Sequence, residues 1–322
     1  MLISQGPLRM SLFGGGSDLP AYLERHDGAV LSFAINRRVY VVGHPFTHRS
    51  GILLKYSQTE DVSHSRDLLH PIAREVLGRY GVNNIDIAIM SDVPAGTGLG
   101  SSSSFTVAFL AFVRQLTGHS STPEELAKEA CEIEIEVLKE PIGYQDQWAS
   151  ALGGINILRF SGAEVSVEPL ALTSATISAL QDNLHLVPVG ESRSAGKLLQ
   201  RQGAALTHGS EQEKATSALV ALVDQGKQAL QSAIDDLGPL LNEAWELKRQ
   251  TSQMISNDEV DAAYSRGLTG GATGGKLLGA GGGGYLAFYV PKAKQEEFAA
   301  KFPQRLEFAI NFDGAGIIHD SA

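Results

Sequence analysis

The sequence predicts an α+β protein of two domains. Its 322 residues exceed what one hydrophobic core normally organises, and 43% of them are apolar, enough for a sizeable buried core. Alternating, strand-like segments are frequent up to about residue 163, whereas two long amphipathic helices dominate the remainder. We therefore expect one domain over residues 1–165 and a second over residues 166–322.

The amino-acid composition limits the kinds of molecule that the protein can be expected to bind. The net charge of −10 argues against a nucleic-acid or acidic-membrane surface, although a phosphorylated small molecule would need only a local basic pocket. The single Cys131 excludes an internal disulfide and fits a reducing compartment. We find no signal-peptide pattern and no apolar run long enough to span a bilayer. We expect a cytoplasmic protein that acts on small molecules, and a homo-oligomer is left open.

The chain begins with a strand-like run over 7–13 and a tight loop over 14–18. Asp18 at the end of this loop could cap a helix over about 21–25, or the loop glycines could clear space for its carboxylate to bind sugar hydroxyls. Arg9, taken alone, fits a surface charge at the end of a strand. Further on we expect strands over 29–35, 38–44 and 52–56, and a helix over 68–80.

Residues 94–104 read Pro-Ala-Gly-Thr-Gly-Leu-Gly-Ser-Ser-Ser-Ser, between a predicted strand over 85–89 and a predicted helix over 105–116. Glycines at such a junction let the backbone turn sharply and point its N–H groups at one spot, where the helix adds its positive dipole end. The serine hydroxyls can bind phosphate oxygens or a metal ion. The segment therefore predicts a phosphate-binding loop.

The alternative for this loop is a glycine-rich turn with serine caps that binds nothing. Three alternating glycines and four serines exceed what capping needs. It is not a Walker loop, because no Lys follows its last glycine. A metal ion or basic residues from elsewhere must therefore balance the phosphate charge.

A helix is expected from Pro123 to about Leu138, since Thr122 and Glu125 form a capping box around the proline. Glu134 and Glu136 lie on opposite edges of its apolar stripe, so helical spacing leaves open which of them is a buried functional carboxylate. The helix breaks at Pro141.

Asp146 stands between two glutamines, beside Gly143, Tyr144 and Trp148. This setting is unusual for an exposed turn. The structural alternative is that Asp146 caps a short helix over 147–152, after which a strand is expected over 155–160.

The second half predicts strands over 165–170 and 184–189, and long helices over 211–232 and 237–255. Residues 192–197 group Ser, Arg and Lys at a helix start, where an anion could bind. Residues 279–284 fit G-x-G-x-x-G, but they lead into a strand over 286–290 and not into a helix, which excludes a dinucleotide fingerprint. These glycines are better placed to bring bare backbone against a nucleotide or substrate.

Three glycine-containing motifs, over 7–18, 94–104 and 276–285, together resemble the GHMP kinase family. The resemblance implies an N-terminal domain that binds ATP and has the fold of ribosomal protein S5 domain 2. It also implies a C-terminal domain that is a ferredoxin-like α/β sandwich, with the active site between the two domains. The sequences of residues 9–18 and 140–147 are most similar to those of bacterial kinases of D-glycero-D-manno-heptose 7-phosphate. Fucokinases share much of it.

The resemblance also implies residue roles. Mg²⁺ would be held by Ser102 and Glu134, which settles the choice that helical spacing left open. Asp146 matches the catalytic Asp and Arg9 its basic partner. The residues implied for ATP are Pro94, Gly96, Thr97, Gly98, Leu99, Gly100, Ser101, Ser102 and Ser103. Those implied or considered for the acceptor are Gly15, Gly16, Ser17, Asp18, Tyr144, Arg193, Lys197, Gly281 and Gly282.

The expected reaction is phosphorylation of the anomeric hydroxyl of D-glycero-D-manno-heptose 7-phosphate to the 1,7-bisphosphate, toward nucleotide-activated heptose for capsule or lipopolysaccharide. Asp146 would take the hydroxyl proton and Arg9 would keep Asp146 ionised. Arg193 and Lys197 are the candidates for holding the 7-phosphate. Gly-Gly-Gly-Ser-Asp replaces the Gly-Glu-His-Thr-Asp of galactokinases, which argues against galactose. The alternatives are a 1-kinase for a free sugar such as fucose, or a non-catalytic sugar- or nucleotide-binding relative.

Overall fold

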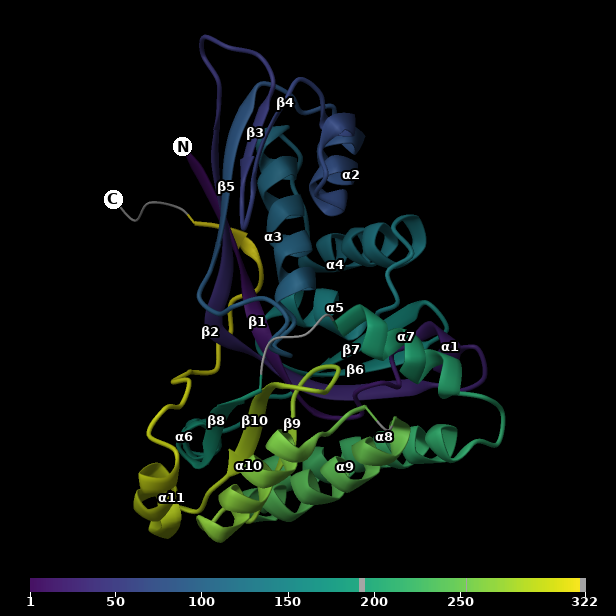
Figure 1. Ribbon diagram of the computed structural model, residues 1–322, viewed down its shortest axis with the longest axis vertical. Coiled ribbons are helices and arrows are strands. Elements are labelled where there is room, and N and C mark those ends of the chain that lie inside the picture. The colour runs from purple at the N-terminus through teal and green to yellow at the C-terminus, as the bar shows by residue number, and fades with distance from the viewer. Residues whose placement is uncertain (191–194, 253, 319–322) are drawn as a thin grey trace.

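The computed structural model describes residues 1–190, 195–252 and 254–318, which form two β-sheets with helices packed on them (Figure 1). The larger sheet has the strand order β11-β1-β2-β5-β3-β4, and β6 pairs with β2 and β7 with β6. Its strands are β1 (Leu2–Phe13), β2 (Gly28–Pro45), β3 (Ile52–Lys55), β4 (Thr59–Val62), β5 (Ile85–Ser91), β6 (Ile155–Ser161), β7 (Glu164–Pro169) and β11 (Gly316–Ile317). The mixture of an antiparallel-rich sheet and separate helices confirms the predicted α+β class.

One long strand, β2, replaces the two strands predicted over 29–35 and 38–44. The same strand pairs with β1 along most of its length, with β6 through its first half and with β5 through its second half. Its register against β1 shifts between Pro7 and Leu8. Pro7 has no N–H to donate to the ladder, so a bulge is accommodated there without losing a hydrogen bond.

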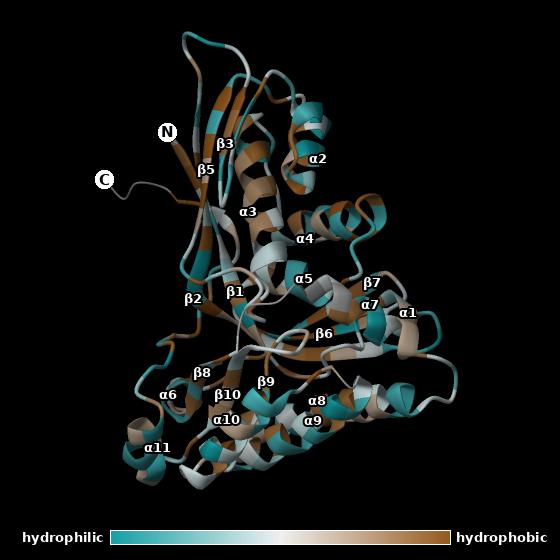
Figure 2. Ribbon diagram, in the orientation of Figure 1, coloured by the Kyte–Doolittle hydropathy of each residue, from teal (hydrophilic) through white to brown (hydrophobic). Residues whose placement is uncertain are grey.

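Helix α3 (Ser101–Leu116) is the central helix of the larger sheet, and it begins at Ser101, four residues before the prediction. Residues 103–113 of α3 are all buried, as expected for a helix that is apolar on every side, and Figure 2 shows its apolar colouring. Ser104 donates to Gly6 O at 2.8 Å, and Ser4 donates to Ala108 O at 2.7 Å. These bonds hold α3 close against β1.

Three further helices lie on the same side of the sheet as α3 (Figure 1). They are α2 (Pro71–Arg79), α4 (Pro123–Cys131) and α5 (Gln145–Leu152). The predicted capping box of α4 is present, with both reciprocal bonds between Thr122 and Glu125. The α-helix ends at Cys131, however, and a π-helical turn, η2 (Glu132–Val137), continues it. Such turns re-aim side chains and are frequent at functional sites.

The smaller sheet, β8-β10-β9, is antiparallel and consists of β8 (Leu184–Val189), β9 (Gly274–Leu277) and β10 (Gly284–Tyr289). An isolated bridge from Leu306 to Leu186 adds a fourth position beside β8. With the intervening helices, this order reproduces the β-α-β-β-α-β arrangement of a ferredoxin-like sandwich.

The helices of the second half are α6 (Ser174–Asn183), α7 (Ala195–Ala205), α8 (Glu211–Ser232), α9 (Leu237–Thr251), α10 (Asp258–Thr269) and α11 (Gln295–Lys301). The bounds predicted for α8 are confirmed, whereas α9 ends four residues before the prediction. Helices α6, α10 and α11 had no counterpart in the prediction. None of the helices in the described ranges is long and apolar enough to cross a membrane.

Both halves of the chain contribute to the larger sheet. Strand β7 runs across residue 165, where we expected the domain boundary, and pairs with β6 as far as Pro169. Near the C-terminus, β11 returns to pair with β1. The smaller sheet and helices α8, α9 and α10 lie together below the larger sheet in Figure 1. Arg9 lies on β1 of the larger sheet, close to the region where the larger sheet meets the C-terminal part of the chain.

Candidate active site

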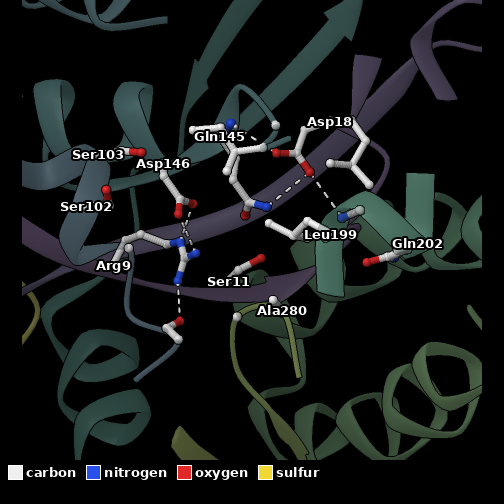
Figure 3. Close-up of a pocket in the computed structure, with 18 of the residues that line it drawn as sticks. Arg9, Ser11, Asp18, Ser102, Ser103, Gln145, Asp146, Leu199, Gln202 and Ala280 are labelled. Carbon is white, nitrogen blue, oxygen red and sulfur yellow. Dashed lines mark hydrogen bonds and ion pairs between the residues drawn. The ribbon is translucent and has the colours of Figure 1, made fainter. Parts of the chain in front are cut away.

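A cavity lies where the larger sheet meets the C-terminal part of the chain, and all three sequence motifs contribute to its wall (Figure 3). The first motif contributes Arg9, Ser11, Gly15, Gly16 and Asp18. The second contributes Gly96, Gly98, Gly100, Ser101, Ser102 and Ser103, and the third Lys276, Gly279 and Ala280. Gly143, Gln145 and Asp146, near the start of α5, also line the cavity, and Figure 3 shows Gln145 and Asp146 on the side opposite Ala280.

The glycine-rich loop has the backbone that a phosphate cradle requires. Gly96, Gly98 and Gly100 have φ values of 76°, 84° and 77°, in the region that favours glycine. A Cβ on Gly98 would lie 2.6 Å from Leu278 O, and one on Gly100 would lie 3.2 Å from Asp146 Oδ2. Gly100 is also the N-cap of α3, so bare backbone and the positive helix end face one cavity. This arrangement fits the phosphates of a nucleotide.

Three residues implied for ATP lie outside the cavity wall and shape the loop from behind. Thr97 Oγ1 donates to Pro94 O at 3.0 Å. Leu99 is fully buried, and its carbonyl accepts a hydrogen bond from Arg9 N at 3.0 Å. We assign these three residues to loop conformation and not to direct contact.

Arg9 and Asp146 form a two-pronged ion pair in the cavity. Arg9 Nε donates to Asp146 Oδ1 at 2.7 Å and Nη2 donates to Oδ2 at 2.8 Å, while Nη1 donates to Gly98 O at 2.6 Å. The Arg9 side chain is 5% exposed and that of Asp146 23%. The paired fork fixes the carboxylate plane, and the third bond ties the pair to the cradle. Arg9 is therefore not the surface charge that its place in the sequence suggested.

Asp146 lies in the first turn of α5 and does not cap it, so the capping alternative for this residue is wrong. The N-cap position belongs to Tyr144, which makes no side-chain cap. Tyr144 is partly buried but does not line the cavity. Instead, Gln145 extends into the cavity next to Asp146 (Figure 3).

Asp18 links the first motif to α5. Its Oδ1 accepts hydrogen bonds from Gly16 N and Gln145 Nε2, both at 3.1 Å, and its Oδ2 accepts one from Gln145 N at 3.2 Å. Burial, and secondarily the charge of Asp146, raises the pKa of Asp18. Helix α1 (Pro20–Leu23) has Leu19 at its N-cap, so the capping alternative for Asp18 is also wrong.

Three other residues implied for the acceptor lie away from the cavity wall. Ser17 is buried and exchanges hydrogen bonds of 3.1 Å with the backbone of Ala29, so it anchors the loop to β2. Gly281 and Gly282 lie off the cavity, where Gly282 N donates to Ile255 O at 2.9 Å. The neighbouring Gly279 and Ala280 line the cavity in their place.

Glu134 is the buried carboxylate of the π-helical turn, whereas Glu136 is exposed. Thr106 Oγ1 donates to Glu134 Oε1 at 2.9 Å, and Gln147 Nε2 donates to Oε2 at 2.7 Å. Burial raises the pKa of Glu134 to about 7, against the opposing effect of its hydrogen bonds, which include one from Ser103. Glu134 therefore lies behind the first turns of α3, next to the serines.

The donor set fits Mg²⁺ only in part. The described residues contain no group of three or more His, Cys, Asp or Glu side chains that could hold a metal ion. A carboxylate and serine hydroxyls are nevertheless hard oxygen donors, and Mg²⁺ commonly takes one or two protein ligands together with phosphate oxygens and waters. Glu134 and the serines at the start of α3 are suited to that role.

Two buried lysines line the cavity, and we did not predict either of them as a site residue. Lys276 Nζ donates to Leu12 O at 2.7 Å, and Lys248 Nζ donates to Leu277 O at 2.7 Å and Gly279 O at 2.6 Å. Burial lowers the pKa of Lys276 to about 7 and that of Lys248 well below its usual range. A basic residue opening the third motif was the only sequence signal for Lys276, and Lys248 had none.

Ser11 was also missed, although strand periodicity signalled it. Residues two apart on a strand face the same side, so Ser11 shares the face of Arg9. Its Oγ and Gln145 Oε1 are buried without a hydrogen-bond partner in the described ranges, and both residues line the cavity. Free polar atoms of this kind are the expected contacts of a polar ligand.

Helix α7 borders the cavity through Leu199 and Gln202. Gln202 is 4% exposed and its Nε2 donates to Thr251 Oγ1 at 3.3 Å. Arg193, which we expected to hold a phosphate, lies outside the described residues. Lys197 belongs to α7, but its side chain is likewise outside the description.

Comparison with known proteins agrees with this geometry. The family model described as GHMP kinases N terminal domain matches residues 67–154, and that described as GHMP kinases C terminal matches residues 227–307. Together the two regions span just over half of the chain. The second glycine motif and the π-helical turn lie within the first region.

Individual relatives extend the match to the whole chain. A D-glycero-alpha-D-manno-heptose 7-phosphate kinase from Campylobacter jejuni is 29% identical over 311 residues, 91% of this chain and 90% of the relative. A bifunctional fucokinase/GDP-fucose pyrophosphorylase from Arabidopsis thaliana is 27% identical over 95% of this chain, which spans 31% of that longer protein. The crystal structure of a D-glycero-D-manno-heptose 1-phosphate kinase from Bacteroides thetaiotaomicron superposes with a TM-score of 0.81 at 23% identity, covering 100% of both chains. The fold, the motifs and these matches agree with the predicted resemblance, and the chain belongs to the GHMP kinase family.

Proposed function

We propose that the protein transfers a phosphoryl group from ATP to the anomeric hydroxyl of D-glycero-D-manno-heptose 7-phosphate and releases the 1,7-bisphosphate. The observation that carries the proposal is the position of Asp146, whose carboxylate is held by Arg9 directly beside Gly100 of the cradle. A phosphate in the cradle and a hydroxyl at Asp146 would be neighbours. The 29% identity to the Campylobacter jejuni heptose 7-phosphate kinase favours this acceptor.

Phosphoryl transfer depends on positioning and on neutralised charge more than on covalent chemistry. In this proposal Asp146 accepts the proton of the attacking hydroxyl. Arg9 donates two hydrogen bonds to the Asp146 carboxylate and so fixes its plane at the cavity. The side chain of Asp146 remains accessible to an acceptor, because it is 23% exposed whereas Arg9 is almost fully covered.

The acceptor is oriented by polar groups around Asp18. The bonds from Gly16 and Gln145 leave the Asp18 carboxylate in a fixed position at the cavity wall. Gln145 Oε1 adds an acceptor without a partner in the described part of the chain. These groups are suited to a polyol such as a sugar.

The donor nucleotide is proposed to bind at the cradle, where backbone N–H groups and the start of α3 stabilise its phosphates. A bound Mg²⁺ would supply positive charge to the phosphate oxygens. Ser102 at the cavity wall and Glu134 behind it are the residues proposed to hold the ion. The product would serve the synthesis of nucleotide-activated heptose for a surface polysaccharide.

A substrate panel tests the proposal. The purified protein is incubated with ATP and Mg²⁺ and with each of D-glycero-D-manno-heptose 7-phosphate, the free heptose, fucose, galactose and mevalonate, and ADP release is measured together with the product by NMR. We expect the highest kcat/KM for the heptose 7-phosphate, with the new phosphate on C1. Transfer to another position, or a strong preference for mevalonate, would refute it.

The second candidate is a 1-kinase for an unphosphorylated sugar. The match to the fucokinase-containing Arabidopsis thaliana protein, which covers 95% of this chain, favours it. In the same panel, this function would give a higher kcat/KM for free fucose than for any sugar phosphate.

A further inference from the structure

The charged side chains of the cavity wall do not balance. Arg9 and Asp146 neutralise each other in their ion pair. The remaining charged groups at the wall are Asp18, Lys248 and Lys276. Within the described ranges neither lysine has a carboxylate at ion-pair distance, and the hydrogen bonds of both Nζ atoms go to backbone carbonyls. The two lysines on the C-terminal side of the cavity therefore lack a counter-charge, and an anion bound beside them would favour the ammonium form of both.

Such lysines are costly unless a ligand compensates them. Lys276 is 3% exposed and Lys248 is 8% exposed, and removing an ammonium group from water without a counter-charge is strongly unfavourable. An ammonium group has three donors. The backbone contacts use one donor of Lys276 and two of Lys248, so each lysine keeps at least one donor for another partner. An anion in the cavity would supply the counter-charge and accept hydrogen bonds from the remaining donors.

The position of Lys276 favours the acceptor half of the cavity. Its partner Leu12 lies on β1 directly after Ser11 and just before the loop that carries Asp18. Ser11 is 6% exposed, lines the cavity and has an Oγ without a partner in the described part of the chain. Figure 3 shows Ser11 between Arg9 and Ala280, on the side of the cavity away from Ser102 and Ser103.

Lys248 supports the same region from the third motif. It binds the carbonyl of Gly279, and Gly279 and Ala280 line the cavity. The phosphates of a nucleotide already have the backbone of the cradle and the start of α3 as binding groups. The lysines are therefore available for a different anion.

We propose that Lys276, Lys248 and Ser11 form a binding site for a phosphate group that the acceptor sugar already carries. The inference rests on the proposed sugar-kinase function and adds the residues that distinguish a sugar phosphate from a free sugar. A phosphate monoester dianion would accept hydrogen bonds from both ammonium groups and from the Ser11 hydroxyl. In this proposal the two lysines and Ser11 determine the preference for a phosphorylated acceptor over a free sugar.

The test compares two acceptors that differ only in the phosphate. kcat and KM are measured for D-glycero-D-manno-heptose 7-phosphate and for D-glycero-D-manno-heptose, with the wild type and with Lys276→Met, Lys248→Met and Ser11→Ala. Since a hydrogen bond to a charged group is worth roughly a 10- to 100-fold effect, the preference for the phosphorylated sugar should fall by that factor in each lysine variant. The preference should fall by about 3- to 10-fold in Ser11→Ala. The change should appear in KM for the phosphorylated sugar.

Lys301→Met is the matched control, because Lys301 Nζ also donates to a backbone carbonyl, Thr269 O at 2.6 Å, but lies far from the cavity on α11. It should keep the wild-type preference. Lys276→Arg retains the charge and should recover part of the preference that Lys276→Met loses. Thermal melts and near-UV circular dichroism report whether each variant is folded.

If a variant does not fold, the phosphate site can still be tested by inhibition of the wild-type protein. Inorganic phosphate should inhibit competitively against heptose 7-phosphate; competition against ATP alone would overturn the assignment. Equal losses for both sugars in the lysine variants would also overturn it, because the lysines would then serve the transferred phosphoryl group or the loop itself.

The outcomes separate this inference from the function on which it rests. Turnover of neither sugar would refute the sugar-kinase proposal and the phosphate site with it. Turnover of both sugars with an unchanged preference in all three variants would refute the phosphate site alone.

Discussion

Gly98 and Gly279 pack backbone against backbone, and this contact joins the phosphate cradle to the third motif. A Cβ on Gly279 would lie 2.2 Å from Gly98 Cα, and a Cβ on Gly98 would lie 2.6 Å from Leu278 O and 3.2 Å from Gly279 N. No side chain fits between the two segments. Gly279 therefore supports the cradle through a backbone contact. We expect it to do so without a hydrogen bond of its own to the nucleotide.

Substitution of Gly279 tests this support. Gly279→Ala places a Cβ against the cradle at a residue whose φ is 68°, so we expect a loss of stability of about 2–4 kcal/mol from overpacking and strain. We also expect a rise of more than 10-fold in KM for ATP, since the cradle must shift. Gly118→Ala is the control, because Gly118 has a φ of 78° and no atom near its added Cβ. Denaturant melts and ATP titrations measure both effects, and similar behaviour of the two variants would contradict the proposed contact.

Replacing the proposed base tests the chemistry. Asp146→Asn keeps the shape of the side chain but removes the charge that Arg9 binds and the site that accepts the proton. We expect kcat to fall by about 10²- to 10⁴-fold, the usual contribution of a general base, with nucleotide affinity changed by less than about 3-fold. Steady-state kinetics and equilibrium titration with a non-hydrolysable ATP analogue separate these effects.

Asp86→Asn is the matched control for Asp146→Asn. Asp86 accepts hydrogen bonds from Lys55 at 2.7 Å and 2.8 Å on the larger sheet, and it does not line the cavity. Its variant should retain wild-type kcat. A kcat for Asp146→Asn within a few fold of the wild type would remove Asp146 from the proton transfer.

The cradle was predictable from the sequence because its structure is local. Three glycines with positive φ and the start of α3 are consecutive in the chain, so turn chemistry alone indicates where their N–H groups point. The capping box at Thr122 was predictable for the same reason. Asp146 and Arg9 were different: taken singly, each suggested a structural role, and only the family resemblance joined two residues 137 positions apart.

The remaining features depend on tertiary contacts that no local pattern carries. Glu134 is buried in the π-helical turn against Thr106 and Gln147, whereas Glu136 is exposed, and helical spacing alone left open which of the two would be buried. Lys248 lies on an amphipathic helix of ordinary spacing, and its burial follows from the packing of α9 under the third motif. The single strand β2 is continuous because it pairs with β1 across the bulge at Pro7.

Gly143 tests the position of Asp18. A Cβ on Gly143 would lie 2.0 Å from Asp18 Oδ2, so Gly143→Ala must displace the carboxylate that we propose to bind sugar hydroxyls. We expect KM for the sugar to rise by about 10-fold or more, with KM for ATP nearly constant, because the loss of one or two hydrogen bonds is of that size. Gly162→Ala, at a glycine with no atom near its added Cβ, should leave both constants unchanged. An equal rise in both KM values would indicate a general distortion of the cavity and not a specific role for Asp18.

His185 on β8 provides a pH-dependent test of stability that is independent of the active site. Its ring contacts Phe298, and its Nε2 is buried without a partner among the described residues. Burial lowers the pKa of His185 to about 4, and the positive charge of Arg305 acts in the same direction. The unfolded chain protonates near pH 6.5, so between pH 6.5 and 4 it binds more protons than the folded chain, and stability falls as the pH falls. Because the ring is partly exposed, we expect a loss of only about 1–2 kcal/mol over this range.

His185→Phe keeps an aromatic ring against Phe298 and removes the titrating group, so its free energy of unfolding should decline less steeply from pH 7 to pH 4.5 than that of the wild type. The exposed His64 gives the control, since His64→Gln should follow the wild-type profile. Urea melts at four or five pH values measure the difference. Parallel profiles for the wild type and His185→Phe would mean that His185 is protonated in the folded protein without cost, against the burial and the unpaired Nε2 described above.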